Sequence, residues 1–141
     1  MRMLSRLMAA VDRVSPPAVA SAHCDLPCGV YDPAQARIEA ESVKAIQEKY
    51  QGNDDPVFRE RCIQIKEERA DLVKHHLWVL WTDYFKPPHL EKYPQLHQLF
   101  WDATKAAGAG GVKASVDPAD GQKLLDLIAE IDKIFWETKK A

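Results

Sequence analysis

Three Asp-Pro pairs, at positions 32–33, 55–56 and 117–118, constrain the fold of this chain more than any other feature of its sequence. Aspartate is a preferred N-cap residue and proline is favoured at the first helical position, so each pair predicts the start of a helix. The Gly-Asn pair at 52–53, the Pro-Pro pair at 87–88 and the glycine-rich segment 108–111 predict helix ends.

Apolar residues recur at helical spacing between these signals, and a further helix is expected to begin near Tyr93 and Pro94. Arg69 lies on the stripe of the second helix, an unusual position for a charge. No stretch alternates with a period of two for long enough to predict a strand. Four amphipathic helices with short connections predict an all-α fold, an antiparallel up-down four-helix bundle over residues 32–141. The predicted stripes are Ile38, Val43, Ile46 and Tyr50; Phe58, Cys62, Ile65, Leu72, His76, Val79 and Leu80; Leu96, Leu99, Phe100 and Ala103; and Leu124, Ile128, Ile131 and Phe135.

Size and charge narrow the class of protein. The 141 residues are one domain's length, which excludes a large two-domain enzyme with its own cofactor fold. The formal net charge is −2, so we expect no nucleic-acid partner held by bulk positive charge. No run of about 18 apolar residues occurs, so we expect no membrane-spanning segment. Three cysteines are too few for a disulfide scaffold.

Residues 1–22 differ from the rest of the chain. They carry Arg2, Arg6 and Arg13 against the single acidic residue Asp12, so without them the formal charge changes from −2 to −4. The segment ends in Ala-Ser-Ala, a small-residue pattern typical of processing sites. Two interpretations stay open from this segment alone: a disordered tail, or a pro-segment that is removed before His23. Its charges and its Pro-Pro pair make it a poor secretory signal, which favours a cytoplasmic protein.

Residues 23–31, which we call the hook, carry two thiols and an imidazole within six residues. The Cys-x3-Cys spacing of Cys24 and Cys28 differs from that of zinc knuckles and thioredoxin-type motifs. After a cut before His23, the α-amine of His23 and the backbone nitrogen and thiolate of Cys24 would close two fused chelate rings around a metal. Pro27 restricts the following turn and Gly29 lets the chain leave it, so the Cys28 thiolate completes a planar N2S2 site. A planar site favours nickel(II) or copper(II) over zinc, and since copper(II) oxidises thiolates we expect nickel.

This donor set favours redox chemistry. Two thiolates and a deprotonated amide push electron density onto the metal, and the imidazole of His23 is within reach of an axial position. The sequence HCDLPCGVYDP at 23–33 resembles the nickel hook of nickel-containing superoxide dismutases, and the resemblance extends over leader, hook and helices. It implies an enzyme that disproportionates superoxide to dioxygen and hydrogen peroxide by Ni(II)/Ni(III) cycling. It also implies a precursor trimmed by a dedicated processing peptidase, and a homohexamer of four-helix bundles.

The resemblance assigns roles to residues other than the metal ligands His23, Cys24 and Cys28. Tyr31 and Tyr84 match tyrosines beside the open axial face. Glu39 and Arg69 match a pair that steadies the axial imidazole, which offers a reason for a charge on an apolar stripe. Asp25 and Lys86 match positions at subunit contacts near the site. The Leu26–Pro27 peptide bond matches a cis bond in the family.

Two other functions stay open from the residues alone. The chain could be a nickel or copper delivery or storage module without turnover, or a helical interaction protein with incidental thiols. Tyr31 and Tyr84 favour an enzyme, because a delivery module has no need of tyrosines around an axial opening. The aromatic residues Trp78, Trp81, Tyr84 and Phe85 indicate either an oligomer surface or a bundle end. Structural or solvated roles are expected for Cys62, His75, His76, His89, His97, Lys139 and Lys140.

Overall fold

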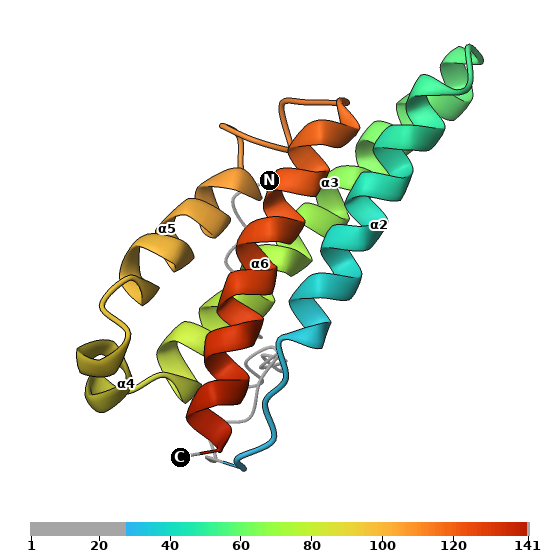
Figure 1. The fold of residues 1–141 in the computed structure, drawn as a ribbon. Helices are drawn as coiled ribbons and strands as arrows, with labels where there is room; N and C mark the ends of the chain where they lie inside the picture. The colour runs from blue at the N-terminus through green and yellow to red at the C-terminus, as the bar shows by residue number, and fades with distance from the viewer. Residues whose placement is uncertain (1–27, 141) are drawn as a thin grey trace, which may run out of the picture.

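The structure, a computed structural model, describes residues 28–140, which contain five α-helices and one π-helical turn and no strand (Figure 1). The predicted pro-segment, and His23, Cys24 and Asp25 of the hook, lie outside the described residues. The elements are α2 (Ala34–Gln51), α3 (Pro56–Val79), η1 (Leu80–Tyr84), α4 (Pro87–Lys92), α5 (Leu96–Ala106) and α6 (Pro118–Lys139).

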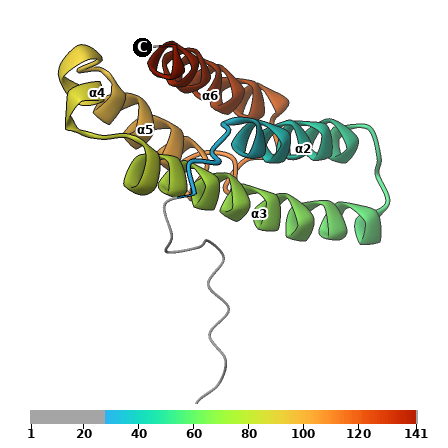
Figure 2. The ribbon, with the colours of Figure 1, turned by 90° about the horizontal axis from the view of Figure 1, so that it is seen from below.

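The four long helices run alternately up and down, so the predicted antiparallel bundle is confirmed (Figure 1). In the view of Figure 2, α2 lies between α6 above it and α3 below it, and α4 and α5 lie to the left. The α2 helix packs against both α3 and α6, and α5 packs mainly against α6. The core consists of the aliphatic and aromatic side chains that these helices turn toward one another, including Val73, Leu77, Leu124 and Phe135.

The Asp-Pro pairs start helices as predicted. Asp55 accepts a hydrogen bond from the backbone N–H of Val57 at 2.9 Å, and Asp117 accepts one from Ala119 at 2.9 Å. Each carboxylate thereby satisfies a backbone N–H group that has no partner within its helix. The first helix begins one residue later than expected, although Asp32 still accepts a hydrogen bond from the Ala34 N–H at 2.8 Å.

The end of the second helix differs from the prediction. After Val79 the chain forms a π-helical turn, closed by a hydrogen bond of 3.0 Å from the Phe85 N–H to the Leu80 carbonyl. The Pro-Pro pair at 87–88 then starts the short helix α4, which the sequence analysis did not expect. Proline fits the first turn of a helix as well as it stops one, so the pair alone does not distinguish the two outcomes.

The predicted apolar stripe of the second helix is confirmed at Cys62 and Leu80 but is off by one residue between them. The side chains that α3 buries include Lys66, Ala70 and Leu77, while Ile65 and Leu72 are only half-buried. In the predicted stripe of α2, Val43 is buried as expected, but Ile38 is 53% exposed. The other side chains that α2 buries are Ala36, Ala40 and Gln47. Small residues let helices approach closely, and a pattern search that counts only large apolar residues overlooks them.

Lys66 is the unexpected member of the core, with 2% of its surface exposed. Its ammonium donates hydrogen bonds to the carbonyl oxygens of Val112, Lys113 and Ser115 at 2.6, 2.8 and 2.8 Å. Burial lowers the pKa of Lys66 from its ordinary value of 10.5, and the charge of Glu67 opposes that shift. One side chain on α3 thereby holds the loop that joins α5 to α6.

Among residues 28–140, no helix combines the length and the apolar character needed to cross a bilayer.

Candidate metal centre

The described part of the hook begins at Cys28, whose thiol is exposed and not in a disulfide. Gly29 follows with a φ of 74°, the left-handed region in which glycine is favoured over other residues. This agrees with the prediction that Gly29 lets the chain leave the turn. Of the three predicted ligands, only Cys28 lies in the described range.

A pocket opens beside Gly29 at the end of the bundle where η1 and the C-terminal end of α6 meet. Its walls are formed by Gly29, Tyr31, Asp83, Tyr84, Lys86, His89 and Lys139, and we call it the tyrosine pocket. The rings of Tyr31 and Tyr84 lie 5.8 Å apart between centroids and are tilted by 55°. The structure therefore brings together Tyr31, Tyr84 and Lys86, three of the residues that the sequence analysis selected.

Tyr84 is held on several sides. Its ring stacks on His89 with centroids 5.6 Å apart, and it meets Phe135 of α6 at 4.4 Å. The hydroxyl group forms a hydrogen bond of 2.7 Å with Oγ1 of Thr138. The π-helical turn places Tyr84 at its last position, and such turns recur at functional sites.

Lys139 is a residue of the pocket that the sequence analysis assigned to plain surface. Its Nζ lies 3.4 Å from the carbonyl oxygen of Gly29 and 5.2 Å from the centre of the Tyr84 ring. No local motif marks Lys139, because only the fold brings the last turn of α6 beside the hook. Lys139 and Lys86 place two positive charges at the pocket, against the one negative charge of Asp83.

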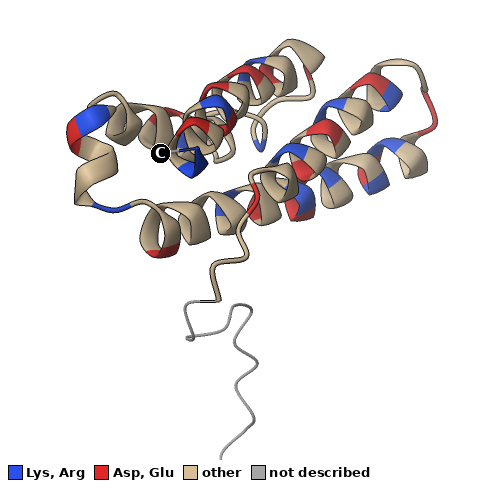
Figure 3. Ribbon diagram, turned by 60° about the horizontal axis from the view of Figure 1, so that its bottom comes forward, with Lys and Arg blue, Asp and Glu red and all other residues tan. Residues whose placement is uncertain are grey.

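Charge elsewhere is mixed in sign. Basic and acidic positions alternate along α2, α3 and α6, without a face of a single sign in that view (Figure 3). An electrostatic attraction of anions to the tyrosine pocket would therefore have to come from its local charges, Lys86 and Lys139 against Asp83, and not from the net charge of the chain.

Glu39 and Arg69 form the predicted pair, but they do not line the tyrosine pocket. Nη1 of Arg69 lies 3.2 and 3.4 Å from the two carboxylate oxygens of Glu39, and the Glu39 side chain is 17% exposed. Arg69 precedes Tyr84 by fifteen residues, which corresponds to about 22 Å along a helix. The Glu39–Arg69 pair and the tyrosine pocket therefore lie at different heights along the bundle.

His76 lies near this pair. Burial, followed by the like charge of His75, lowers the pKa of His76 below its ordinary 6.5, and Glu39 opposes the shift. In residues 28–140, no three His, Cys, Asp or Glu side chains come close enough to hold a metal ion together. A site with three or more such donors that includes Cys28 must therefore draw at least one of them from outside this range.

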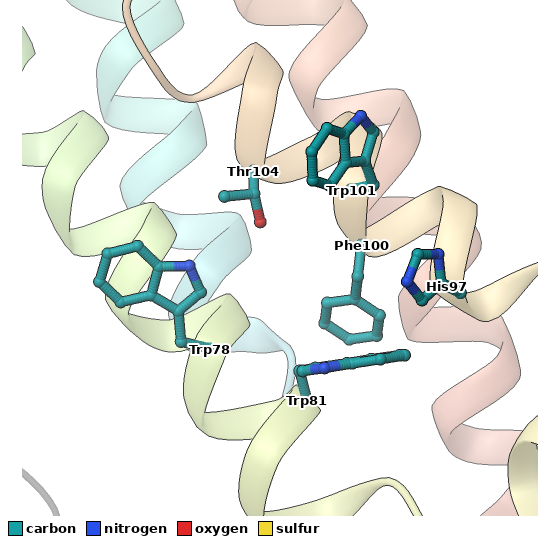
Figure 4. A pocket seen from close by; sticks show the side chains of 6 residues that line it. All are labelled: Trp78, Trp81, His97, Phe100, Trp101 and Thr104. Carbon is teal, nitrogen blue, oxygen red and sulfur yellow. The ribbon is translucent and has the colours of Figure 1, made fainter.

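A second hollow lies between α3, η1 and α5, away from the hook (Figure 4). It is lined by Trp78, Trp81, His97, Phe100, Trp101 and Thr104, and two of its tryptophans, Trp78 and Trp101, are about half exposed. Trp81 packs on Phe100 at 5.1 Å and joins the core as a bundle-end residue. With His97 as its one titratable side chain, this hollow offers no set of metal donors.

An exposed thiol directly before Gly29, which lines a pocket with two tyrosines and two lysines at one end of a helical bundle, suits a thiolate-ligated metalloenzyme that acts on a small anion. Comparison with known proteins identifies the family. Residues 18–139 match the nickel-containing superoxide dismutases, and the chain belongs to this family.

Two curated relatives carry the name superoxide dismutase [Ni]. The protein of Streptomyces coelicolor is 69% identical over 139 residues, covering 99% of this chain and all of the relative. The protein of Streptomyces seoulensis is 68% identical with the same coverage. The native structure of a nickel superoxide dismutase is 73% identical with a TM-score of 0.81, covering 84% of this chain and 100% of that one. A crystal structure of a nickel-containing superoxide dismutase, with nickel ligation that corresponds to the oxidised state, is 72% identical. Its TM-score and coverage are the same.

The enzyme is accordingly a nickel-dependent superoxide dismutase, as the sequence analysis predicted, and a delivery or storage module is not favoured. The residues present fit the metal, since thiolate and imidazole are donors that suit nickel and Cys28 presents its thiol on the surface.

Proposed function

We propose that the hook holds nickel after residues 1–22 have been removed. The amine and imidazole of His23, the backbone nitrogen and thiolate of Cys24, and the thiolate of Cys28 would be the ligands. The observation that supports this most directly is the position of Gly29, which follows Cys28 and forms part of the tyrosine pocket. A metal on Cys28 would therefore lie at the mouth of a pocket built for a small anion.

When bound, nickel supplies the one-electron chemistry by which superoxide is disproportionated to dioxygen and hydrogen peroxide. The chain's own residues bind and orient the substrate. Lys86 and Lys139 attract the anion into the pocket. Tyr31 and Tyr84 form part of the pocket wall, with their ring centroids 5.8 Å apart, so both lie beside an anion that enters.

Glu39 and Arg69 would steady the imidazole of His23 in this proposal. In the proposed homohexamer, Asp25 and Lys86 would lie at subunit contacts near the site. A dedicated peptidase would expose His23, and the poor secretory character of residues 1–22 supports a cytoplasmic location.

The ligand assignment is tested by replacing one cysteine at a time. Cys28→Ser removes a thiolate, so we expect the purified protein to lose its nickel and its dismutase activity. Cys62 is the matched control, because it is a buried cysteine of α3 away from the hook. Cys62→Ser is expected to keep nickel and activity.

Intact mass and metal analysis of the natively expressed protein complete the test. A mass that starts at His23, with one nickel ion per chain, supports the proposal. A fully active Cys28→Ser protein, or an active enzyme that still starts at Met1, would contradict it.

A further inference from the structure

The hydrogen-bond directions around Thr138 determine what the Tyr84 hydroxyl can do. Oγ1 of Thr138 lies 2.6 Å from the carbonyl oxygen of Phe135 and 2.7 Å from the hydroxyl of Tyr84. A carbonyl oxygen only accepts, and a threonine hydroxyl has one hydrogen to donate. That hydrogen therefore goes to Phe135, and Tyr84 must be the donor in its bond to Thr138.

The phenolic proton of Tyr84 consequently points to α6, and the lone pairs of its oxygen are left to accept. The ring itself has little freedom, because His89 stacks on one side at 5.6 Å and Phe135 packs at 4.4 Å. Turning the proton into the tyrosine pocket would break the bond to Thr138. A hydrogen bond of ordinary strength contributes about 1 kcal/mol, so the proton prefers the position toward Thr138 over the position toward the pocket about fivefold.

We propose that Thr138 is a positioning residue for dismutation, and that it holds Tyr84 as a hydrogen-bond acceptor in the tyrosine pocket. Two superoxide anions and two protons give one dioxygen and one hydrogen peroxide, so protons must be delivered. Tyr84 does not give its proton to superoxide in this arrangement. It orients a donor, such as a water molecule or the hydrogen peroxide being formed, and both protons come ultimately from solvent.

This inference rests on the proposed function, in which Tyr84 faces the substrate. The test compares Thr138→Val, which removes the hydroxyl but keeps the branched volume, with Thr138→Ser, which keeps the hydroxyl. Both are made in the nickel-loaded enzyme and in a Tyr84→Phe background. Raman spectra report the donor or acceptor state of tyrosine through the intensity ratio of its Fermi doublet, and difference spectra against Tyr84→Phe isolate the signal of Tyr84.

We expect Thr138→Val to shift the Tyr84 doublet away from its donor ratio and to lower kcat/KM about three- to tenfold at unchanged nickel content. Thr138→Ser should restore both readouts, and Thr138→Val should have no further effect once Tyr84 is phenylalanine. An unchanged doublet in Thr138→Val would overturn the inference, as would a changed doublet with unaltered kcat/KM. Wild-type kcat/KM in Tyr84→Phe alone would instead refute the role proposed for the tyrosine pocket.

Discussion

Lys66 allows a quantitative prediction about what holds the bundle together. Lys66→Met keeps the length and the apolar stem of the side chain but leaves the carbonyl oxygens of Val112, Lys113 and Ser115 without their donor. An unsatisfied buried acceptor costs about 1–3 kcal/mol. The bonds to the carbonyls of Lys113 and Ser115 are only partly buried, so water can replace the lost donor there. We therefore expect a loss of about 3 kcal/mol in the free energy of unfolding, most of it from the fully buried bond to Val112.

Urea unfolding of the two proteins under the same nickel loading measures this loss. With a slope of about 2 kcal/mol per molar, the midpoint should fall by about 1.5 M with little change in slope. Lys133→Met on the exposed side of α6 is the matched control, and its midpoint should stay near that of the parent. A Lys66→Met protein as stable as the control would refute the reasoning. The free-energy cost of burying the ammonium would then equal the stabilisation that its hydrogen bonds provide.

Three further predictions concern other parts of the bundle. Gly121→Ala places a Cβ against Oε1 of Gln47 and 2.9 Å from Cα of Lys44, so we expect about 2 kcal/mol of destabilisation, measured as a lower Tm. His76 has a lowered pKa, so the folded protein binds fewer protons than the unfolded chain and its stability falls as the pH drops below about 6.5. His76→Phe should flatten that fall in urea titrations between about pH 7.5 and pH 5.5, and an equally steep fall would show that other groups cause it. Lys139→Gln should lower kcat/KM several-fold at low ionic strength and less at high salt, whereas Lys140→Gln should change it little.

Helix starts could be predicted from the sequence because their cause is local. An aspartate side chain accepts a hydrogen bond from the backbone N–H group two or three residues further along the chain, and this needs no partner from elsewhere in the fold. Which side of a helix is buried depends on its neighbours. The burial of Lys66 requires the carbonyls of a loop 46 residues away, and the burial of Ala40 requires close packing, so neither could be found from periodicity.

The candidate metal centre also combines features with a local cause and features that depend on the fold. The donor set of the hook lies in a single short segment, so the sequence predicts the metal and the class of reaction. The contact between Tyr31 and Tyr84 and the ion pair of Glu39 and Arg69 agree with the predicted groupings. Lys139 and Thr138 were missed because they are separated from the hook by more than a hundred residues, and a C-terminal lysine-rich turn is ordinary in a surface helix.

The meeting of Gly29 with the final turn of α6 has a practical consequence for protein engineering. An affinity tag added after Ala141 would be separated from Lys139 by only two residues, and removal of residues 138–141 would delete both Thr138 and Lys139. An amino-terminal tag fails in a different way, since the proposed cut before His23 would discard it. Residues 52–55, which join α2 to α3 at the far end of the bundle (Figure 1), offer an exposed turn for labels or fusions that leave the reactive end untouched.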